Sequence, residues 1–237
     1  MKKADAYKAY FTKEYLMGPN SLRLLEEMLE RYPLEKGIRV LDLGCGKGLT
    51  SLFLAKEADV NVFATDLWNS ATENNTRFNE WNISDKVIPI HVDANDLPFA
   101  ENYFDAVVSI DSFHYFATQP FFFEQKILPL LKPNGAAIIA MPGLKEEIHG
   151  KEPQVILEWS DGEENEYHLY HSREWWLKHI GQSDDFKVLM SFDLESFDEA
   201  WQDWFLSKHE FALCDEEFFK KGIGQYLSIV GLVIQKV

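Results

Sequence analysis

Short hydrophobic runs alternate with amphipathic segments along most of this chain. Five of the runs are rich in β-branched and apolar residues and have the length of single strands; they span Ile38–Leu43, Val60–Thr65, Val87–Val92, Phe104–Ile110 and Ala136–Met141. Nearly continuous hydrophobicity is typical of strands in a parallel sheet that is covered on both faces. The pattern therefore predicts a central parallel sheet.

The segments between these runs have the composition of crossover helices. They cover Leu49–Lys56, Asn69–Trp81 and Gln119–Leu131. The last of them opens with Pro120, in a position where a missing N–H costs nothing. A repeated strand–helix order predicts a doubly wound (Rossmann-like) α/β fold.

Two more strands are expected in the C-terminal part, over Phe186–Phe192 and Tyr226–Lys236. The helix between them is preceded by Ser196-x-x-Glu199, which matches a capping box. The short connection Gly222-Ile-Gly224 favours an antiparallel last strand at the edge of the sheet.

Capping residues mark two further helices. Asn20 and Ser21 precede an amphipathic segment that runs to Arg31. Ser172 precedes a second segment, and that segment carries Trp175 and Trp176. The second helix lies in a stretch of mixed Gly, Glu and His composition, which is expected to be an insertion rather than a separate domain.

The charge of the chain narrows the range of partners. Lys+Arg number 23 and Asp+Glu number 39, which gives a formal net charge of −16. Nucleic acid and anionic membrane surfaces would be repelled, whereas a cationic substrate remains open. The two cysteines are too few for a disulfide framework, no secretory signal is evident, and no apolar run is long enough to span a membrane. These observations predict a cytoplasmic protein.

A glycine-rich turn follows the first predicted strand and reads Val40-Leu-Asp-Leu-Gly-Cys-Gly-Lys-Gly48. Its three glycines permit backbone angles that a side chain forbids, and they let a ligand lie against the main chain. The spacing is G-x-G-x-G: Leu49 stands where a dinucleotide-binding turn has its last glycine, and a P-loop ending is missing. Asp42, within the turn, is expected either to orient the loop through backbone N–H groups or to touch the ligand.

Acidic residues follow the second and third predicted strands. Asp66 lies 22 residues beyond Gly44, where a carboxylate can accept hydrogen bonds from both hydroxyls of a ribose. The stretch Asp93–Phe99 suits the rim of an adenine, and the fourth strand runs into Ser109–Phe116. This set indicates a nucleoside cofactor without choosing between nicotinamide and methionine cofactors.

Taken in this order, the motifs resemble the class I S-adenosylmethionine-dependent methyltransferases, particularly the small-molecule branch. The resemblance is carried by Val40–Gly48, Asp66–Trp68, Asp93–Phe99, Phe104–Phe116 and Leu131–Gly135. It implies S-adenosylmethionine as cofactor, S-adenosylhomocysteine as product, and methyl transfer to a small-molecule acceptor. It also implies a seven-stranded sheet with one antiparallel strand.

The resemblance divides the chain into parts of a single methyltransferase domain: an N-terminal helical cap (1–35), a cofactor-binding core (36–141), an insertion over the substrate site (142–182) and C-terminal elements that complete the sheet (183–237). The residues that it implies for cofactor binding are Gly44, Cys45 and Gly46 beside the methionine part, Asp66 on the ribose, Leu67 and Trp68 against the adenine, Asp93 and Ala94 at the adenine edge, and Asp111 near the sulfonium.

The expected chemistry needs few catalytic groups, because the sulfonium carbon is already electrophilic. Positioning alone can supply about 7–11 kcal/mol. His114 and Tyr115 follow the fourth strand, where the methyl should project, and His114 is the candidate base for an acceptor that must lose a proton. It can equally be a structural histidine. Tyr15, His114 and Trp175 are the candidate substrate-binding residues.

Two other site types are not favoured. Cys45 is expected to fill space inside the glycine loop, because nothing in the sequence supplies a base for a nucleophilic thiol. The seven histidines show no H-x-x-x-H or H-E-x-x-H spacing, so no metal site is expected.

Two rival functions remain open at this point. An NAD-dependent oxidoreductase would share the glycine loop and the ribose carboxylate, but the missing third glycine and the segment Leu131–Gly135 count against it. A non-catalytic cofactor-binding protein of the same fold would keep the motifs without turnover.

Overall fold

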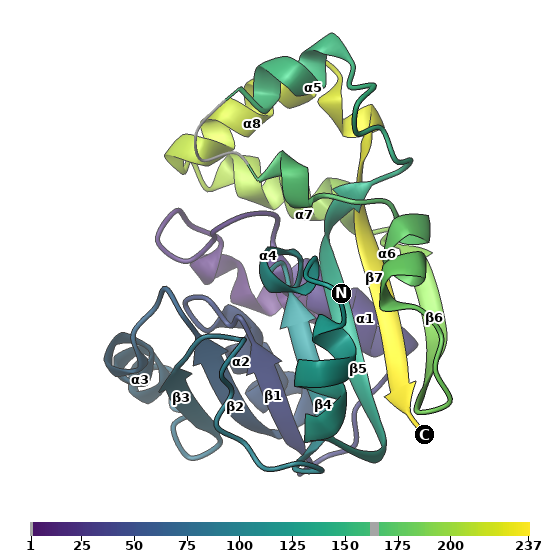
Figure 1. Ribbon diagram of the computed structural model, residues 1–237. Helices are drawn as coiled ribbons and strands as arrows, with labels where there is room; N and C mark the ends of the chain where they lie inside the picture. Colours follow the sequence, from purple (N-terminus) through teal and green to yellow (C-terminus); the bar gives the residue numbers. More distant parts are fainter. Residues whose placement is uncertain (1, 162–165) are drawn as a thin grey trace.

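The computed structural model of the protein describes residues 2–161 and 166–237. At its centre lies a seven-stranded sheet in the order β3-β2-β1-β4-β5-β7-β6 (Figure 1). The strands are β1 (Arg39–Leu43), β2 (Asn61–Asp66), β3 (Val87–His91), β4 (Phe104–Ile110), β5 (Leu131–Leu144), β6 (Phe186–Asp193) and β7 (Leu227–Lys236). The predicted doubly wound, mostly parallel sheet with an antiparallel last strand is confirmed.

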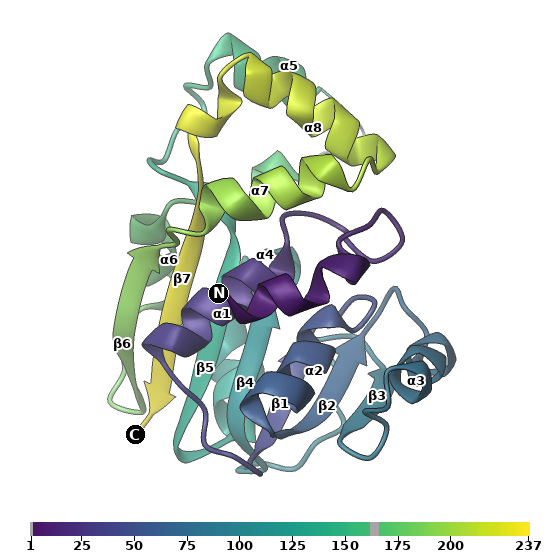
Figure 2. The ribbon, with the colours of Figure 1, turned by 180° about the vertical axis from the view of Figure 1, so that it is seen from behind.

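Eight α-helices surround the sheet in the described part of the chain. They are α1 (Ser21–Arg31), α2 (Leu49–Phe53), α3 (Ala71–Glu80), α4 (His114–Ala117), α5 (Gln154–Trp159), α6 (Arg173–Ile180), α7 (Phe197–Leu206) and α8 (Glu210–Lys220). Helices α1 and α2 cover one face of the sheet, and α4 and α6 lie on the other (Figures 1 and 2). Each face has its own buried apolar cluster, as expected for a three-layer α/β protein.

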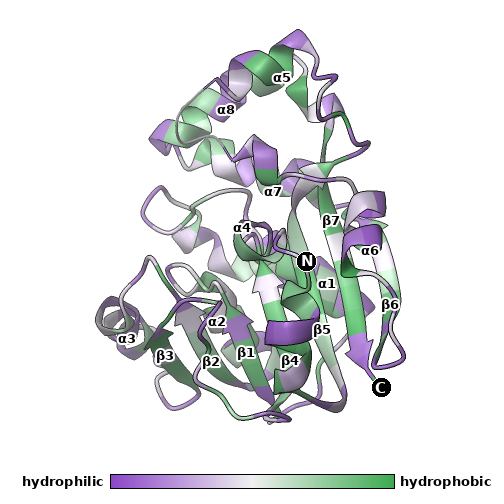
Figure 3. Ribbon diagram, in the orientation of Figure 1, coloured by the Kyte–Doolittle hydropathy of each residue, from purple (hydrophilic) through white to green (hydrophobic). Residues whose placement is uncertain are grey.

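The hydrophobic pattern explains the core. Strands β5 and β7 are apolar along most of their length (Figure 3), and they pair antiparallel from Ala136 opposite Gln235 to Leu144 opposite Leu227. Strand β1 pairs parallel with both β2 and β4, so the strand order reverses beside β1. Open α/β sheets bind ligands at such a reversal.

Helices α5, α7 and α8 form a layer beyond the end of the sheet to which β1 and β4 point (Figures 1 and 2). An ion-pair cluster ties this layer to the N-terminal segment: Arg23 in α1 donates to Asp203 in α7 (2.9 Å) and lies 2.9 Å from Asp5. Among the described residues, no helix is both long and apolar enough to cross a membrane.

The predicted placement of the last strand at the sheet edge is wrong. Strand β7 lies between β5 and β6, and β6 forms the edge. Both neighbours of β7 pair with it antiparallel. The short connection at Gly222–Gly224 sets the direction of β7 but carries no information about which strand pairs with its second side.

The predicted capping box at the start of α7 is also wrong. Ser196 precedes the helix, but its side chain makes no capping hydrogen bond. The buried carboxylate of Glu27 in α1 accepts instead from the backbone N–H groups of Ser196 (2.8 Å) and Glu195 (3.1 Å). A capping box does form at α3, where the Ser70 side chain accepts from the backbone N–H of Glu73.

The helix expected over Gln119–Leu131 is shorter and irregular. Phe121 has a φ of +63°, which interrupts helical geometry directly after Pro120. A π-turn then spans Phe123–Ile127, a 3₁₀ turn follows, and Leu131 already belongs to β5. The caps expected at Asn20 and Ser172 are present, because each side chain accepts a backbone N–H of its helix.

Candidate functional site

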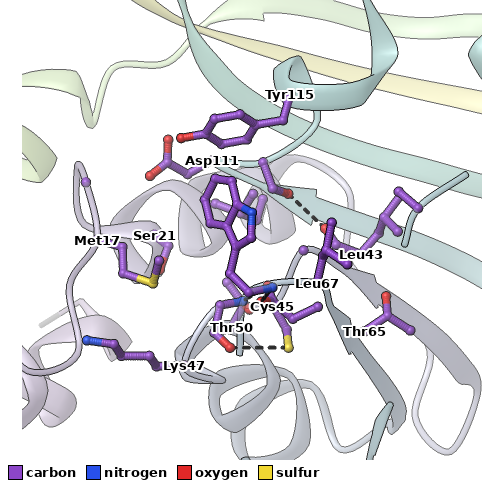
Figure 4. A pocket seen from close by; sticks show the side chains of 18 of the residues that line it. Met17, Ser21, Leu43, Cys45, Lys47, Thr50, Thr65, Leu67, Asp111 and Tyr115 are labelled. Atoms are coloured by element: carbon purple, nitrogen blue, oxygen red, sulfur yellow. Dashed lines mark hydrogen bonds between the residues drawn. The ribbon is translucent and has the colours of Figure 1, made fainter. Parts of the chain in front are cut away.

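A pocket of about 330 Å³ lies at the carboxyl edge of β1, β2 and β4 (Figure 4). This volume is within the range of small-ligand sites. All nine residues predicted to bind the cofactor line it, together with Tyr15 and Tyr115: Gly44, Cys45, Gly46, Asp66, Leu67, Trp68, Asp93, Ala94 and Asp111. The structure thus brings together residues that are far apart in the sequence.

The glycine turn forms the floor of the pocket. Gly44 has a φ of +75°, and a Cβ there would lie 2.4 Å from the Cβ of Ser112. Around Gly46 (φ +54°) the nearest atom to an added Cβ is the sulfur of Met17, at 3.4 Å. Only glycine permits both the backbone angle and the close approach at position 44.

Asp66 joins the end of β2 to the glycine turn. Its Oδ2 accepts from the backbone N–H of Gly46 (2.8 Å), and its Oδ1 accepts from the backbone N–H groups of Trp68 (2.9 Å) and Asn69 (2.7 Å). Oδ2 therefore retains acceptor capacity toward the pocket, while Oδ1 is occupied. Asp66 thus holds the glycine turn and the segment after β2 in place, and it also lines the pocket.

Two exposed apolar side chains follow Asp66. Leu67 is 51% exposed and Trp68 is 62% exposed, although both line the pocket. The Trp68 ring meets the Tyr115 ring edge to face, at 4.9 Å between centroids. Exposed apolar groups beside a pocket are a feature of ligand-binding sites, because a ligand can cover them.

Asp93 also lines the pocket, and hydrogen bonds from the backbone N–H and side-chain amide of Asn95 lower the pKa of its carboxyl.

Asp111 occupies a strained position at the end of β4. Its φ is +58°, which is costly for a residue with a Cβ and is characteristic of functional sites. Within residues 2–161 and 166–237 its carboxylate makes no hydrogen bond or ion pair. Burial and the nearby Glu166 charge raise the pKa of Asp111 well above its usual range. Figure 4 shows this carboxylate next to the Tyr115 ring.

His114 packs against Tyr115 and does not itself line the pocket. It is 1% exposed, and neither ring nitrogen has a hydrogen-bond partner among the residues that the structure describes. Burial lowers the pKa of His114, so the ring is neutral near pH 7. Its ring packs on that of Tyr115 at 4.2 Å between centroids, and its Nε2 lies 3.9 Å from Oε2 of Glu166.

The N-terminal segment forms one side of the pocket. Tyr15, Met17 and Gly18 line it, and Tyr15 packs against Tyr10 at 5.5 Å between ring centroids. A Cβ on Gly18 would lie 2.4 Å from Oδ2 of Asp111, so glycine allows this segment to reach the carboxylate. The position of Tyr15 is compatible with its predicted substrate-binding role, which stays a prediction.

Trp175 does not line the pocket. Its ring is stacked between His171 (3.6 Å between centroids) and His179 (4.3 Å) on α6. Its helix packs beside β6, and the two histidine rings cover the indole. The expected contact of Trp175 with the acceptor stays a prediction.

Asp42 connects β1 to α2 beneath the glycine turn and does not line the pocket. Its buried Oδ2 accepts from the hydroxyls of Thr50 (2.7 Å) and Ser51 (2.6 Å), not from backbone N–H groups of the loop. Its other oxygen, Oδ1, is buried and has no hydrogen-bond partner within the described part of the chain. Burial raises the pKa of Asp42 to about 6.

This burial predicts a pH-dependent stability. A raised carboxyl pKa means that the folded state binds the proton more tightly than the unfolded state, so the stability associated with Asp42 falls as pH rises from about 4 to about 6. The Asp42→Asn variant does not titrate at this position. Its free energy of unfolding, minus that of wild type, should rise by about 2 kcal/mol from pH 4 to pH 7. Urea unfolding at both pH values measures this difference, and a constant difference would contradict the assignment.

Cys45 fills space in the glycine turn, as expected. Burial raises the pKa of its thiol well above the usual range, which disfavours the nucleophilic thiolate.

One potential metal-ligand set, Glu147, His149 and His171, has its ligand atoms within 4.8 Å of one another. The sequence spacing gives no sign of it. His171 is hydrogen-bonded to Glu147 (3.1 Å) and His149 to the Tyr170 carbonyl (2.8 Å).

Sequence reasoning missed three contributors. Asn74 in α3 donates its amide N–H to the Gly46 carbonyl (3.0 Å) and so holds the glycine turn from below. Ser112 fills the space that the missing Cβ of Gly44 leaves, and its hydroxyl donates to the Leu43 carbonyl (2.8 Å). Glu166 approaches His114 from the insertion. Asn74 and Glu166 lie in no recognisable motif, and Ser112, although it lies within the Phe104–Phe116 motif, gives no sign in the sequence of its contact with Gly44.

The strand order defines this chain as a doubly wound α/β protein with a pocket at the point of reversal, where such sheets bind ligands. Residues 41–139 match the family model described as a methyltransferase domain. This match supports the resemblance to the class I S-adenosylmethionine-dependent methyltransferases that the motifs predict.

Similar curated proteins share this core. Arginine-hydroxylase NDUFAF5 of Homo sapiens is 39% identical over 103 residues, which cover 44% of this chain and 28% of the relative. The 27-O-demethylrifamycin SV methyltransferase of Amycolatopsis mediterranei (strain S699) is 32% identical over 94 residues, or 39% of this chain and 35% of the relative. The matched region thus spans about a third or less of these relatives.

The fold extends beyond the matched core. Phosphoethanolamine N-methyltransferase 2 of Haemonchus contortus, solved with S-adenosyl-L-methionine, superimposes with a TM-score of 0.76 over 98% of this chain and 56% of that chain. At 20% identity the likeness concerns the fold alone.

Proposed function

We propose that this protein binds S-adenosylmethionine in the pocket of Figure 4 and transfers its methyl group to a small molecule, releasing S-adenosylhomocysteine. The observation that carries the proposal is the composition of the pocket wall in order: the glycine turn, Asp66, the exposed Trp68 and the unpaired Asp111. Bound S-adenosylmethionine would supply an electrophilic methyl group on a sulfonium.

The pocket fits the parts of this cofactor. The open backbone at Gly46 leaves room for the methionine chain, and Asp66 offers Oδ2 to the ribose. Leu67 and Trp68 offer apolar surface to a flat purine. Asp111 would face positive charge, since both the sulfonium and the amino group of the cofactor are cationic.

The protein's own contribution is mainly positional. The rigid end of β4 fixes Asp111 and Tyr115 beside the place where the methyl would project. Tyr15 and Met17 flank this place from the N-terminal segment and would exclude water from it. Positioning of two reactants is worth about 7–11 kcal/mol, which is enough to account for much of the catalysis.

The test is formation of S-adenosylhomocysteine. Purified protein with S-adenosylmethionine is offered amines, phenols, thiols and carboxylic acids, and both products are measured by mass spectrometry. We expect time-dependent S-adenosylhomocysteine and a methylated product with one acceptor class. Cofactor binding without transfer to any acceptor would favour the non-catalytic alternative. The direct readout matters because one relative is named an arginine-hydroxylase, so a shared core leaves the reaction open.

Replacement of Trp68 by alanine tests the adenine contact. Stacking of a base on an aromatic ring is worth about 1–3 kcal/mol, so the dissociation constant for S-adenosylhomocysteine should rise about 5–150-fold. The unfolding temperature without ligand should not change, because Trp68 is 62% exposed. Phe211→Ala, which removes another exposed ring (54%), is the matched control and should bind normally. Equal affinities in titration calorimetry would remove Trp68 from the adenine site.

A further inference from the structure

A second polar cluster adjoins the cofactor pocket behind Tyr115. The ring of Tyr115 lines the pocket on one side and packs on His114 on the other. The ring of Tyr170 meets His114 edge to face, at 5.6 Å between centroids. Glu166 reaches the same place, with its Oε2 3.9 Å from Nε2 of His114. We call these four residues the acceptor wall.

His114 shows that this wall is built for a ligand. It is 1% exposed, and within residues 2–161 and 166–237 neither ring nitrogen has a hydrogen-bond partner. Leaving a buried polar group unpaired costs free energy. A bound molecule that offers an N–H or O–H to Nε2 would recover this cost.

The charges around the wall have a single sign. Those that act on Tyr170 are Glu166, Asp111 and Asp215. Asp215 is already satisfied, because the indole N–H groups of Trp159 and Trp204 donate to its two oxygens (2.9 Å each). Asp111 has no hydrogen-bond or ion-pair partner within the described residues, and Glu166 faces no basic group there except His114, at 3.9 Å, while it also interacts with the hydroxyl of Tyr115.

A ligand that balances this arrangement must be cationic. Among the described residues no lysine or arginine is paired with either carboxylate, so the two would repel a carboxylate or phosphate acceptor. They would attract an ammonium group, and the faces of Tyr115 and Tyr170 can hold such a group as well. Glu166 is 37% exposed, so a small molecule can reach it from solvent.

We propose that the acceptor is a small amine, whose ammonium group is held by Glu166 and Asp111 against the tyrosine rings of the acceptor wall. This inference rests on the proposed methyl transfer. His114 Nε2 accepts the proton that an ammonium must lose, and the freed nitrogen lone pair forms the new N–C bond. The C–S bond breaks with its electron pair remaining on sulfur. Glu166 then faces the imidazolium and stabilises it.

The test uses a pair of probes that differ in charge alone. Choline and its neutral analogue 3,3-dimethylbutan-1-ol are titrated into protein saturated with S-adenosylhomocysteine, and binding is followed by calorimetry. We expect choline to bind at least about 10-fold more tightly, because a cation over aromatic rings and beside carboxylates gains energy that the analogue lacks. Equal affinities, or no binding of either probe, would overturn the proposal.

Two variants test whether the preference for choline depends on Glu166. Glu166→Gln should abolish the preference for choline and leave the affinity for S-adenosylhomocysteine unchanged. Glu158→Gln, on the same insertion with its carboxylate paired to Lys221 at 3.7 Å, is the matched control and should keep the preference. A preference that survives in Glu166→Gln would place the cation elsewhere and refute the assignment.

The outcomes separate this inference from the proposed function. Turnover of phenols or thiols without a choline preference would leave methyl transfer standing and reject the amine. A choline preference without turnover of any amine would leave the cation site standing and reject the transfer.

Discussion

Replacement of His114 by alanine is expected to lower kcat by about 10²–10⁴-fold, because loss of a positioned general base has an effect of this size. The affinity for S-adenosylhomocysteine should be unchanged, since His114 does not line the cofactor pocket. In the described part of the chain neither ring nitrogen has a partner, so packing alone does not explain a polar ring at this position. The measurement is steady-state kinetics with the acceptor found in the screen, together with cofactor titration.

The pH profile separates a chemical role from a structural one. Burial lowers the pKa of His114, so the neutral base is fully present near pH 7 and is lost only as pH falls through this lowered value. The acid limb of kcat should therefore lie below the usual histidine pKa, and it should vanish in the variant. His114→Gln keeps polarity and most of the volume, and thermal unfolding checks that it folds. A rate that is unchanged in either variant would remove His114 from the chemistry.

Replacement of Gly44 by alanine is expected to abolish cofactor binding and to lower the free energy of unfolding by about 2–4 kcal/mol. The added Cβ would lie 2.4 Å from the Cβ of Ser112 and 2.5 Å from its hydroxyl oxygen. Ser112 cannot withdraw easily, because its hydroxyl is bonded to the Leu43 carbonyl and to Ser109. The glycine turn must therefore shift away from the pocket floor. Calorimetric titration and urea unfolding measure the two effects.

Gly37→Ala is a matched control for this clash. Gly37 has the same φ of +75°, but a Cβ there would meet no atom within 4 Å. Both variants thus carry the same backbone strain, and only Gly44→Ala adds the collision. If both lose the same stability and both bind the cofactor, the close approach to Ser112 is not what position 44 requires.

Local sequence information was enough to predict the core of this protein. The strands up to β5 are short apolar runs, and the residues that follow β1, β2 and β3 reach the pocket because parallel strands end at the same sheet edge. Gly44, Asp66 and Trp68 could be placed for this reason. Each is adjacent in sequence to the strand that positions it.

Features that depend on distant partners were not predictable in this way. The position of β7 in the sheet depends on its pairing with β6, and the sequence of β6 does not indicate which strand it pairs with. Glu27 displaces the expected cap at Ser196 from 169 residues away. In the site, Glu166 comes from the insertion and meets His114 only in the folded chain, whereas Trp175 turns away on α6.

The most direct test of the central claim is thermal unfolding with S-adenosylmethionine, S-adenosylhomocysteine or NAD, for wild type and Trp68→Ala. A ligand at about 100 times its dissociation constant stabilises the native state by about 2.7 kcal/mol, a clear shift. The two methionine-derived ligands should stabilise wild type, the shift should shrink in Trp68→Ala at the same concentration, and NAD should have no effect. Stabilisation by NAD alone would contradict the assignment of this pocket to S-adenosylmethionine.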